Sequence, residues 1–251
     1  MSKSVEKEYV PYIEKVSPRP AYSGVNDVYG GLLLKQCGYL DTTCYLSSVR
    51  RLIERGGTFL EARAAENELI VQPEGVKYKN FEADKVIFCN GTQQNGLFDW
   101  LPIRALKGET LKIKSSLDKE LIINRGVYMV PLTEEGEWRV GATYNIKDET
   151  PLATEFARLE LTNKLKELIH YPFEIVGQEW GFRPTTPDRR PILGQHPEFR
   201  SAFIFNGMGT KGVSLAPFFS EILIHSIENG VPLNKEVGIE RYKVLYWSSS
   251  K

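Results

Sequence analysis

The sequence predicts a mixed α/β fold, in which a β-rich segment is inserted into an α/β part built from both ends of the chain. Apolar runs and amphipathic helical patterns alternate before residue 102 and after residue 200. Between these positions, strand patterns separated by turn residues dominate, as in an antiparallel sheet. We therefore expect one part made of residues 1–101 and 201–251, and a second part made of residues 102–200.

Composition and charge bound the class of protein. The 251 residues are 41% hydrophobic and 25% charged, which is ordinary for a globular protein with a sizeable core. Thirty-two basic and 32 acidic residues cancel, which removes a global electrostatic case for nucleic acid or an anionic membrane. Cys37, Cys44 and Cys89 lack metal-ligand spacing and favour a reducing compartment. With no secretory signal and no membrane-spanning run in view, we expect a cytoplasmic protein.

The elements of the first part follow from local patterns. Residues 1–28 are proline-rich and read as irregular chain, and residues 29–41 read as extended, glycine-punctuated segments. Residues 41–57 predict a helix that Asp41 or Thr42 caps, with an apolar face made of Leu46, Val49, Leu52 and Ile53. Short strands are expected at 58–62, 68–72 and 75–80, followed by a buried strand at 83–91.

The helices and strands after residue 102 also follow from local sequence patterns. Strands are predicted at 104–115, 121–133 and 137–145, and the turn at 133–137 indicates a hairpin. Residues 152–171 predict a helix whose apolar face runs through Phe156, Leu159, Leu165 and Leu168. A strand at 173–188 leads into a proline-rich loop, a strand follows at 201–207, and a helix at 213–230 ends at Asn229-Gly230.

The stretch "FNGMGTKGVSLAP", residues 205–217, contains G-x-G-x-x-G at Gly207, Gly209 and Gly212. A dinucleotide-binding first turn needs a second strand after the helix and an acidic residue about 20 positions on. The chain after this helix contains no continuous apolar strand, so the spacing does not indicate such a turn. The stretch reads instead as a glycine-rich helix N-terminus, which either binds nothing or attracts a partner rich in hydrogen-bond acceptors.

Two consecutive segments, "GQEWGFRPTTPDRRPILGQHPE" and "FIFNGMGTKGVSLAPFFSEIL", resemble the C-terminal signature of the D-amino-acid-oxidase superfamily of FAD-dependent oxidoreductases. The segments "GVYMVPLTEEGEWRVGATYN" and "ADKVIFCNG" resemble that family's substrate-domain strands and a strand beside the flavin. The resemblance implies FAD as cofactor and the oxidation of an amino acid or secondary amine, with hydride passing to flavin N5 and an imine as product. It also implies that residues 1–101 and 201–251 form part of a FAD-binding domain and that residues 102–200 form the substrate domain.

The same resemblance implies the cofactor contacts. Gly207, Met208, Gly209 and Thr210 would meet the pyrimidine edge of the isoalloxazine ring, and Gly91 would lie beside the flavin. Reduction places negative charge at this edge, and a helix N-terminus would stabilise it.

Substrate contacts are implied in the same way. Arg183 matches a position that pairs with the substrate carboxylate, for which a guanidinium fork is suited; the alternative is an arginine that pins the following proline loop. Lys211 would also hold carboxylate, or is an ordinary surface lysine. Tyr128 and Tyr144 would wall the substrate pocket, or are plain core or surface residues. No protein base and no metal site is expected, and His196 reads as an ordinary loop histidine.

One departure from the family pattern is clear. Nothing before Tyr29 reads as the family's opening strand, glycine turn and helix, which hold the pyrophosphate. The expectation is therefore the C-terminal portion of a longer flavoenzyme that takes a small amine or amino acid and contacts neither membrane nor nucleic acid. Two alternatives stay open: a cofactor-free binding or interaction module, and the FAD domain of a tRNA-modifying enzyme, for which zero net charge gives no support.

Overall fold

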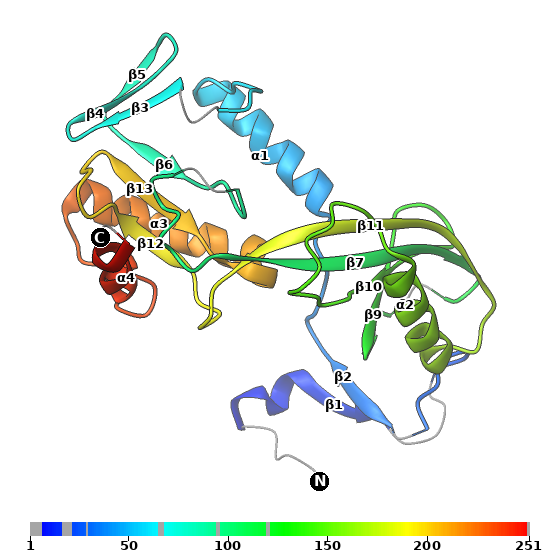
Figure 1. Cartoon of the computed structure of the whole chain (residues 1–251). Coiled ribbons are helices and arrows are strands. Elements are labelled where there is room, and N and C mark those ends of the chain that lie inside the picture. The colour runs from blue at the N-terminus through cyan, green and yellow to red at the C-terminus, as the bar shows by residue number, and fades with distance from the viewer. Residues whose placement is uncertain are drawn as a thin grey trace. The chain divides into compact units, whose positions relative to one another are not determined.

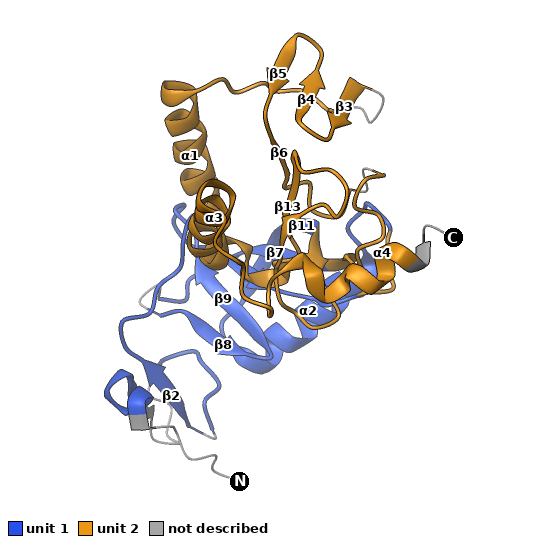
Figure 2. Cartoon of the chain, turned by 90° about the vertical axis from the view of Figure 1, so that its left-hand side faces the viewer, with its two compact units in different colours: residues 1–41, 108–145, 150–181 blue, residues 42–107, 146–149, 182–251 orange. Residues whose placement is uncertain are grey.

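The computed structural model describes residues 7–16, 22–28, 30–64, 68–93, 96–118 and 121–249. The chain divides into two compact units (Figure 2). Unit 1 is Met1–Asp41, Gly108–Asn145 and Thr150–Gly181, and unit 2 is Thr42–Lys107, Ile146–Glu149 and Phe182–Lys251. The first 41 residues, expected in the first part, thus group with the β-rich part, and residues 102–107 and 182–200, expected in the β-rich part, group with unit 2. For the first 41 residues the reason is tertiary, because Val25 forms a β-bridge with Ile169.

Unit 1 contains most of a five-stranded sheet in the order β11-β7-β10-β9-β8 (Figure 1). These strands are β7 (Arg104–Ser115), β8 (Ile123–Arg125), β9 (Val127–Pro131), β10 (Glu137–Gly141) and β11 (Phe173–Thr185). The hairpin expected between β9 and β10 is confirmed: the strands pair antiparallel, and Gly136 in the turn has φ +69°. Alternate residues of β9 are buried, which is the pattern of a sheet with one covered face.

Helix α2 (Glu155–Leu168) packs on this sheet and closes the core of unit 1. Leu161 and Leu165 are fully buried beside Trp138. The predicted apolar face of this helix is half wrong, because Phe156 is 72% exposed and Leu159 is 54% exposed. Two apolar stripes run along α2, and the anchoring of its first turn decides which of them faces the sheet. The buried stripe consists of Ala157, Leu161, Leu165 and Leu168.

A buried carboxylate anchors the first turn of α2. Glu109 of β7 is 2% exposed, and its oxygens accept hydrogen bonds from the Thr154 hydroxyl (2.7 Å), the Thr154 N–H (2.8 Å) and the Gln178 side chain (2.8 Å). Thr154 is the N-cap of α2, and its hydroxyl oxygen accepts the Ala157 N–H. Glu109 therefore ties β7 to the first turn of α2 and to β11.

Unit 2 contains a three-stranded sheet in the order β12-β13-β6, made of β6 (Val86–Phe88), β12 (Ile192–Gln195) and β13 (Ala202–Asn206). β12 and β13 are antiparallel, whereas β13 and β6 are parallel. A second sheet contains β3 (Leu69–Gln72), β4 (Gly75–Tyr78) and β5 (Phe81–Ala83). Helix α3 (Gly212–Asn229) follows β13 and ends at Gly230 with φ +67°, which confirms the predicted stop. The chain continues through η4 (Ile239–Tyr242) into α4 (Lys243–Ser249).

Three local expectations need correction. Residues 58–62 lie outside any strand. Part of the region expected to be irregular is ordered: η1 (Lys7–Tyr12) leads into β1 (Ile13–Val16), which pairs antiparallel with β2 (Gly31–Leu34). Helix α1 (Thr42–Gly56) forms as predicted, but Leu46, Leu52 and Ile53 on its apolar face are exposed. Local sequence patterns are enough to predict that helix α1 forms. They do not predict that its apolar face is buried, because burial needs another element that packs on it.

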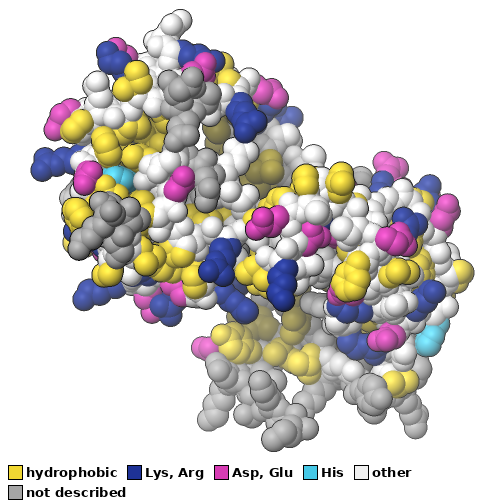
Figure 3. All heavy atoms as spheres, in the orientation of Figure 1, with side chains coloured by type: hydrophobic (Ala, Val, Ile, Leu, Met, Phe, Trp, Pro, Cys, Tyr) yellow, Lys and Arg dark blue, Asp and Glu magenta, His cyan; other side chains and the backbone are white. Residues whose placement is uncertain are grey.

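The surface carries charges of both signs. Figure 3 shows basic and acidic side chains interspersed over the face in view, in keeping with the zero net charge. None of the described helices is both long and apolar enough to cross a lipid bilayer.

Candidate functional site

The carboxyl ends of the two parallel strands of unit 2 lie next to each other, which is where open α/β sheets place their ligands. Asn206, at the end of β13, is 5% exposed. Its side-chain nitrogen donates to the Gly91 carbonyl (2.8 Å), and its side-chain oxygen accepts the Gly207 N–H (2.8 Å). One amide thus joins the loop after β6 to the start of the next turn. Asn206 is not among the site residues expected from the sequence. Its amide side chain lies between a buried strand and a glycine, and this position was a usable signal for a site residue.

Residues 207–211, the glycine loop, connect β13 to α3. Gly207 has φ +75° and Gly209 has φ +54°, which a side chain would strain. A Cβ on Gly207 would also lie 2.7 Å from Thr186 Cγ2, inside any real contact distance. Gly207 is therefore required by both its backbone conformation and its close neighbour.

The glycine loop presents backbone donors. A short 3-10 turn (η3, Gly209–Lys211) begins after Met208, and the Lys211 N–H donates to the Met208 carbonyl (3.0 Å). Among the described residues, no acceptor meets the N–H groups of Met208, Gly209 and Thr210, as expected for groups that precede the first helical hydrogen bond. The 18-residue helix α3 adds its dipole behind them. The loop can therefore stabilise negative charge on a neighbouring group.

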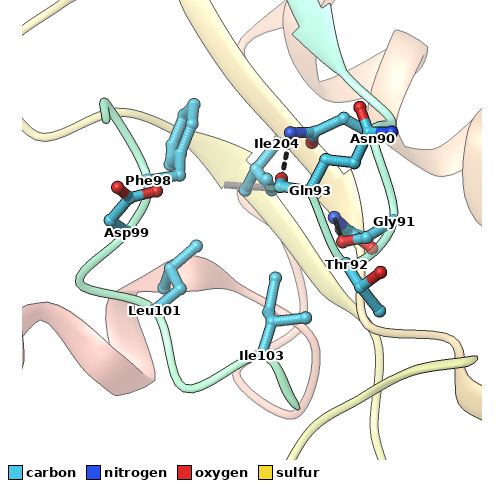
Figure 4. Close-up of a pocket in the computed structure, with 10 residues that line it drawn as sticks. Asn90, Gly91, Thr92, Gln93, Phe98, Asp99, Leu101, Ile103 and Ile204 are labelled. Carbon is cyan, nitrogen blue, oxygen red and sulfur yellow. Dashed lines mark hydrogen bonds between the residues drawn. The ribbon is translucent and has the colours of Figure 1, made fainter. Parts of the chain in front are cut away.

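Beside Gly91 lies a small pocket of about 30 Å³ (Figure 4). Polar groups from Asn90, Thr92 and Gln93 line one side, while Phe98 and Leu101 contribute apolar surface. The pocket is small and its lining is partly polar. On the side of Gly91 where a Cβ would project, nothing lies within 4 Å, so a ligand can approach the backbone there.

Five of the predicted site residues are contiguous in the glycine loop, and the structure brings the segment after Arg183 against them. Arg183 lies half-buried near the end of β11. A Cβ on Gly209 would lie 3.9 Å from the Pro184 carbonyl oxygen and 3.7 Å from Thr185 Oγ1. Lys211 is exposed at the end of the loop. Arg183 and the glycine loop therefore belong to one local structure within unit 2.

Tyr128 and Tyr144 belong to unit 1, and their predicted role stays a prediction. Tyr128 pairs across the sheet with Gly141, which in turn pairs with Thr110. A Cβ on Gly141 would lie 2.6 Å from the Tyr128 hydroxyl oxygen and 2.7 Å from Thr110 Cγ2, so glycine is what lets the tyrosine lie there. Tyr144 is 59% exposed.

His196 has a structural role that its contacts define. It is 4% exposed, and its Nδ1 accepts the N–H groups of Glu198 and Phe199, both at 3.2 Å. Nε2 must then carry the proton and donate to the Leu97 carbonyl (3.1 Å). The ring also packs against Phe98, Phe199 and Tyr246, at centroid distances of 5.1 to 5.2 Å. Burial lowers the pKa of His196 below its ordinary value, so the neutral form is favoured.

This pKa gives a pH prediction. Unfolding restores the His196 pKa to about 6.5, so below that pH the unfolded chain binds a proton that the folded chain resists. The free energy of unfolding should therefore fall as pH drops through about 6.5 toward the lower folded pKa. Urea denaturation at pH 7.5 and 5.5 measures the loss, and His196→Asn should show a smaller loss than the unmodified protein. An equal loss in both proteins would assign the effect to other groups.

The family of this chain follows from its match to a family model. The family model for FAD-dependent oxidoreductases, DAO, matches residues 4–225. The chain belongs to this family. FAD is the cofactor of the family, and the family membership expected from the sequence is confirmed.

Curated relatives of the family are longer than this chain. The bifunctional protein ThiO/ThiG of Synechocystis sp. is 25% identical over 78% of this chain and 32% of that protein. The tRNA 5-methylaminomethyl-2-thiouridine biosynthesis bifunctional protein MnmC of Leptospira interrogans is 25% identical over 84% of this chain and 37% of that protein. The chain thus spans about a third of the length of these two relatives.

Solved structures share the fold. Glycine oxidase from Geobacillus kaustophilus superposes with a TM-score of 0.72 and 18% identity, over 88% of this chain and 64% of that chain. Iminodiacetate oxidase from Chelativorans sp. BNC1 superposes with a TM-score of 0.68 and 19% identity, over 93% of this chain and 69% of that chain. The mixed helix-and-sheet architecture expected from the sequence is therefore confirmed as that of the family.

Proposed function

We propose that this chain takes part in the FAD-dependent oxidation of an amino acid or secondary amine. The glycine loop would meet the pyrimidine edge of the flavin, and Arg183 would hold the carboxylate of the substrate. The observation that carries the proposal is a helix N-terminus with unpaired backbone donors at Met208, Gly209 and Thr210, packed against the strand end that bears Arg183.

The described residues fit one edge of a flavin. A planar ring must approach backbone closely, and nothing lies within 4 Å of a Cβ position on Gly91, so the backbone is open on that side. The three donors of the loop and the dipole of α3 match the acceptor edge, where negative charge develops on reduction. When bound, FAD would supply the acceptor for the hydride that leaves the α-carbon of the neutral amine, which becomes an iminium ion and then releases a proton to water to give the imine. The chain itself supplies orientation and electrostatic stabilisation.

The substrate class follows from the cation near the loop. An arginine fork binds a carboxylate in a bidentate manner and so fixes the orientation of the α-carbon. Lys211, at the end of the same loop, would add a second positive charge, while the wall-forming role of Tyr128 and Tyr144 stays a prediction. Glycine oxidase, iminodiacetate oxidase and L-proline dehydrogenase are named after substrates that each carry an amine and a carboxylate, which supports this class.

A second candidate is an amine on a modified tRNA. The MnmC proteins among the curated relatives, whose name places them in tRNA 5-methylaminomethyl-2-thiouridine biosynthesis, favour it. The interspersed charges and zero net charge do not, since tRNA binding needs a basic surface. Salt-dependent binding of tRNA at micromolar concentration would favour this candidate over a free amino acid.

The test is a substrate screen on FAD-loaded protein. Glycine, sarcosine, iminodiacetate and proline are added without oxygen, and bleaching of the flavin absorbance reports oxidation. Arg183→Ala should lower kcat/KM by about 10- to 100-fold on the best substrate, the effect of losing a hydrogen bond to a charged group. Arg183→Lys should recover part of it, because the charge returns without the fork. The control is Arg51→Ala, an exposed arginine on α1 that donates to Ser48.

Unchanged turnover in Arg183→Ala would remove the carboxylate role of this residue. Binding of FAD would count against the cofactor-free binding module, and FAD-loaded protein that oxidises none of the amines would count against this substrate class.

A further inference from the structure

The chain after α3 lies beyond residue 225, where the match to the family ends, and yet it is built into unit 2. Val237 and Ile239 are buried, and the Leu193 N–H of β12 donates to the Val237 carbonyl (2.9 Å). Gly194 has φ +139°, and a Cβ there would lie 2.6 Å from Ile239 Cγ2. Glycine at position 194 therefore leaves the space that Ile239 occupies in the core. Because Ile239 is the first residue of η4, this contact fixes the position of η4.

From η4, one side chain spans the loop after β11. The Arg241 side chain is 15% exposed, and its Nε lies 3.0 Å from an Asp188 carboxylate oxygen. Its Nη2 donates to the carbonyls of Arg190 (3.2 Å) and Pro191 (2.8 Å), and its Nη1 donates to the Gly238 carbonyl (3.0 Å). Partial burial of Asp188 works against its ionisation, but the hydrogen bonds from Arg241, the Arg190 N–H and Thr186, together with the charge of Arg241, outweigh it, and the pKa of Asp188 is lowered. The guanidinium fork thus fixes three points of the loop at 188–191.

The same loop supports the glycine loop. The Arg190 carbonyl that Arg241 contacts also accepts the Thr186 hydroxyl (2.8 Å). The methyl of that threonine is the group that a Cβ on Gly207 would meet at 2.7 Å. A continuous set of contacts therefore runs from Arg241 through the Arg190 carbonyl and Thr186 to Gly207, all within unit 2.

We infer that Arg241 is a positioning residue for the glycine loop, and that the C-terminal segment 237–242 acts as a clamp that fixes where the backbone donors of that loop point. The consequence for the flavin rests on the proposed function, whereas the effect on the loop does not. A lysine at this position would keep the ion pair with Asp188 but could not reach the carbonyls as a fork.

The test compares Arg241→Gln and Arg241→Lys with Arg190→Gln. Arg190 is the matched control, because its side chain makes only an exposed ion pair with Glu236 (3.4 Å) while its carbonyl stays in place in the variant. Hydrogen exchange is measured first at the amides of Gly207 and Lys211, which donate hydrogen bonds to Asn206 Oδ1 and to the Met208 carbonyl, since local opening there reports on the support of the loop without any cofactor. In Arg241→Gln these amides should exchange about tenfold faster, with a smaller change in Arg241→Lys and none in Arg190→Gln.

The second readout is titration with FAD, followed by the flavin absorbance spectrum. Arg241→Gln should weaken FAD binding and shift the flavin absorbance bands, while Arg190→Gln should leave both unchanged. Equal exchange rates of the Gly207 and Lys211 amides in Arg241→Gln and the unmodified protein would overturn the clamp. Faster exchange in the variant, together with unmodified protein that binds no FAD, would support the clamp and count against the proposed function.

Discussion

Replacement of Glu109 by glutamine is expected to lower the free energy of unfolding by about 2 to 4 kcal/mol. The Glu109 carboxylate accepts three hydrogen bonds, two from Thr154 and one from Gln178. A glutamine offers one oxygen and turns its NH₂ group toward donors, so at least one buried donor loses its partner. Because Thr154 caps α2, the first turn of that helix loses its anchor as well.

Chemical denaturation followed by tryptophan fluorescence measures this loss, since Trp138 is fully buried in the same core. Glu179→Gln is the matched control, because it lies in the same sheet and makes an exposed ion pair with Arg139 (2.9 Å). That change should cost under about 1 kcal/mol. Equal midpoints for the two variants would mean that the Glu109 network adds little stability.

Gly207→Ala is expected to have the second large effect, about 2 to 4 kcal/mol of stability, together with loss of FAD binding. Its φ of +75° disfavours any side chain, and the new Cβ would lie 2.7 Å from Thr186 Cγ2. Gly230→Ala separates these two causes. Gly230 has a similar φ of +67° but nothing within 4 Å of its Cβ position, so the cost there should be about 1 kcal/mol.

A second substitution tests the close contact directly. Thr186→Ser removes the methyl but keeps the hydroxyl that donates to the Arg190 carbonyl. Combined with Gly207→Ala, it should restore part of the lost stability and FAD affinity. If Gly207→Ala matched Gly230→Ala in stability, the contact with Thr186 would not constrain the loop.

The sequence predicted best what depends on a few adjacent residues. Helix α3, its stop at Gly230 and the β9–β10 hairpin all follow from local glycines and apolar spacing, and the family resemblance located the glycine loop. The predictions that were wrong concern which side chains are buried, and this depends on residues distant in the sequence. Nothing near Phe156 shows that Glu109, in a strand 45 residues before Thr154, anchors the first turn of α2 through Thr154.

The candidate site shows the same division. The loop residues and Arg183 carry recognisable motifs, so they could be chosen from the sequence. Arg241 could not, because its importance lies in the carbonyls that it reaches, and carbonyls carry no sequence signal. Whether Arg183, Lys211, Tyr128 and Tyr144 act on substrate stays a prediction.

The two hydrogen bonds of Asn206 also bear on how the protein ages. Asn206-Gly207 is an asparagine-glycine pair, the sequence at which deamidation to aspartate is fastest in unrestrained chains. Here the side chain is buried and held by Gly91 and Gly207, which restrains the rotation that the reaction needs. Aspartate at 206 would set a carboxylate oxygen against the Gly91 carbonyl and separate the ends of β6 and β13. The durability of the site in storage therefore depends on one amide nitrogen.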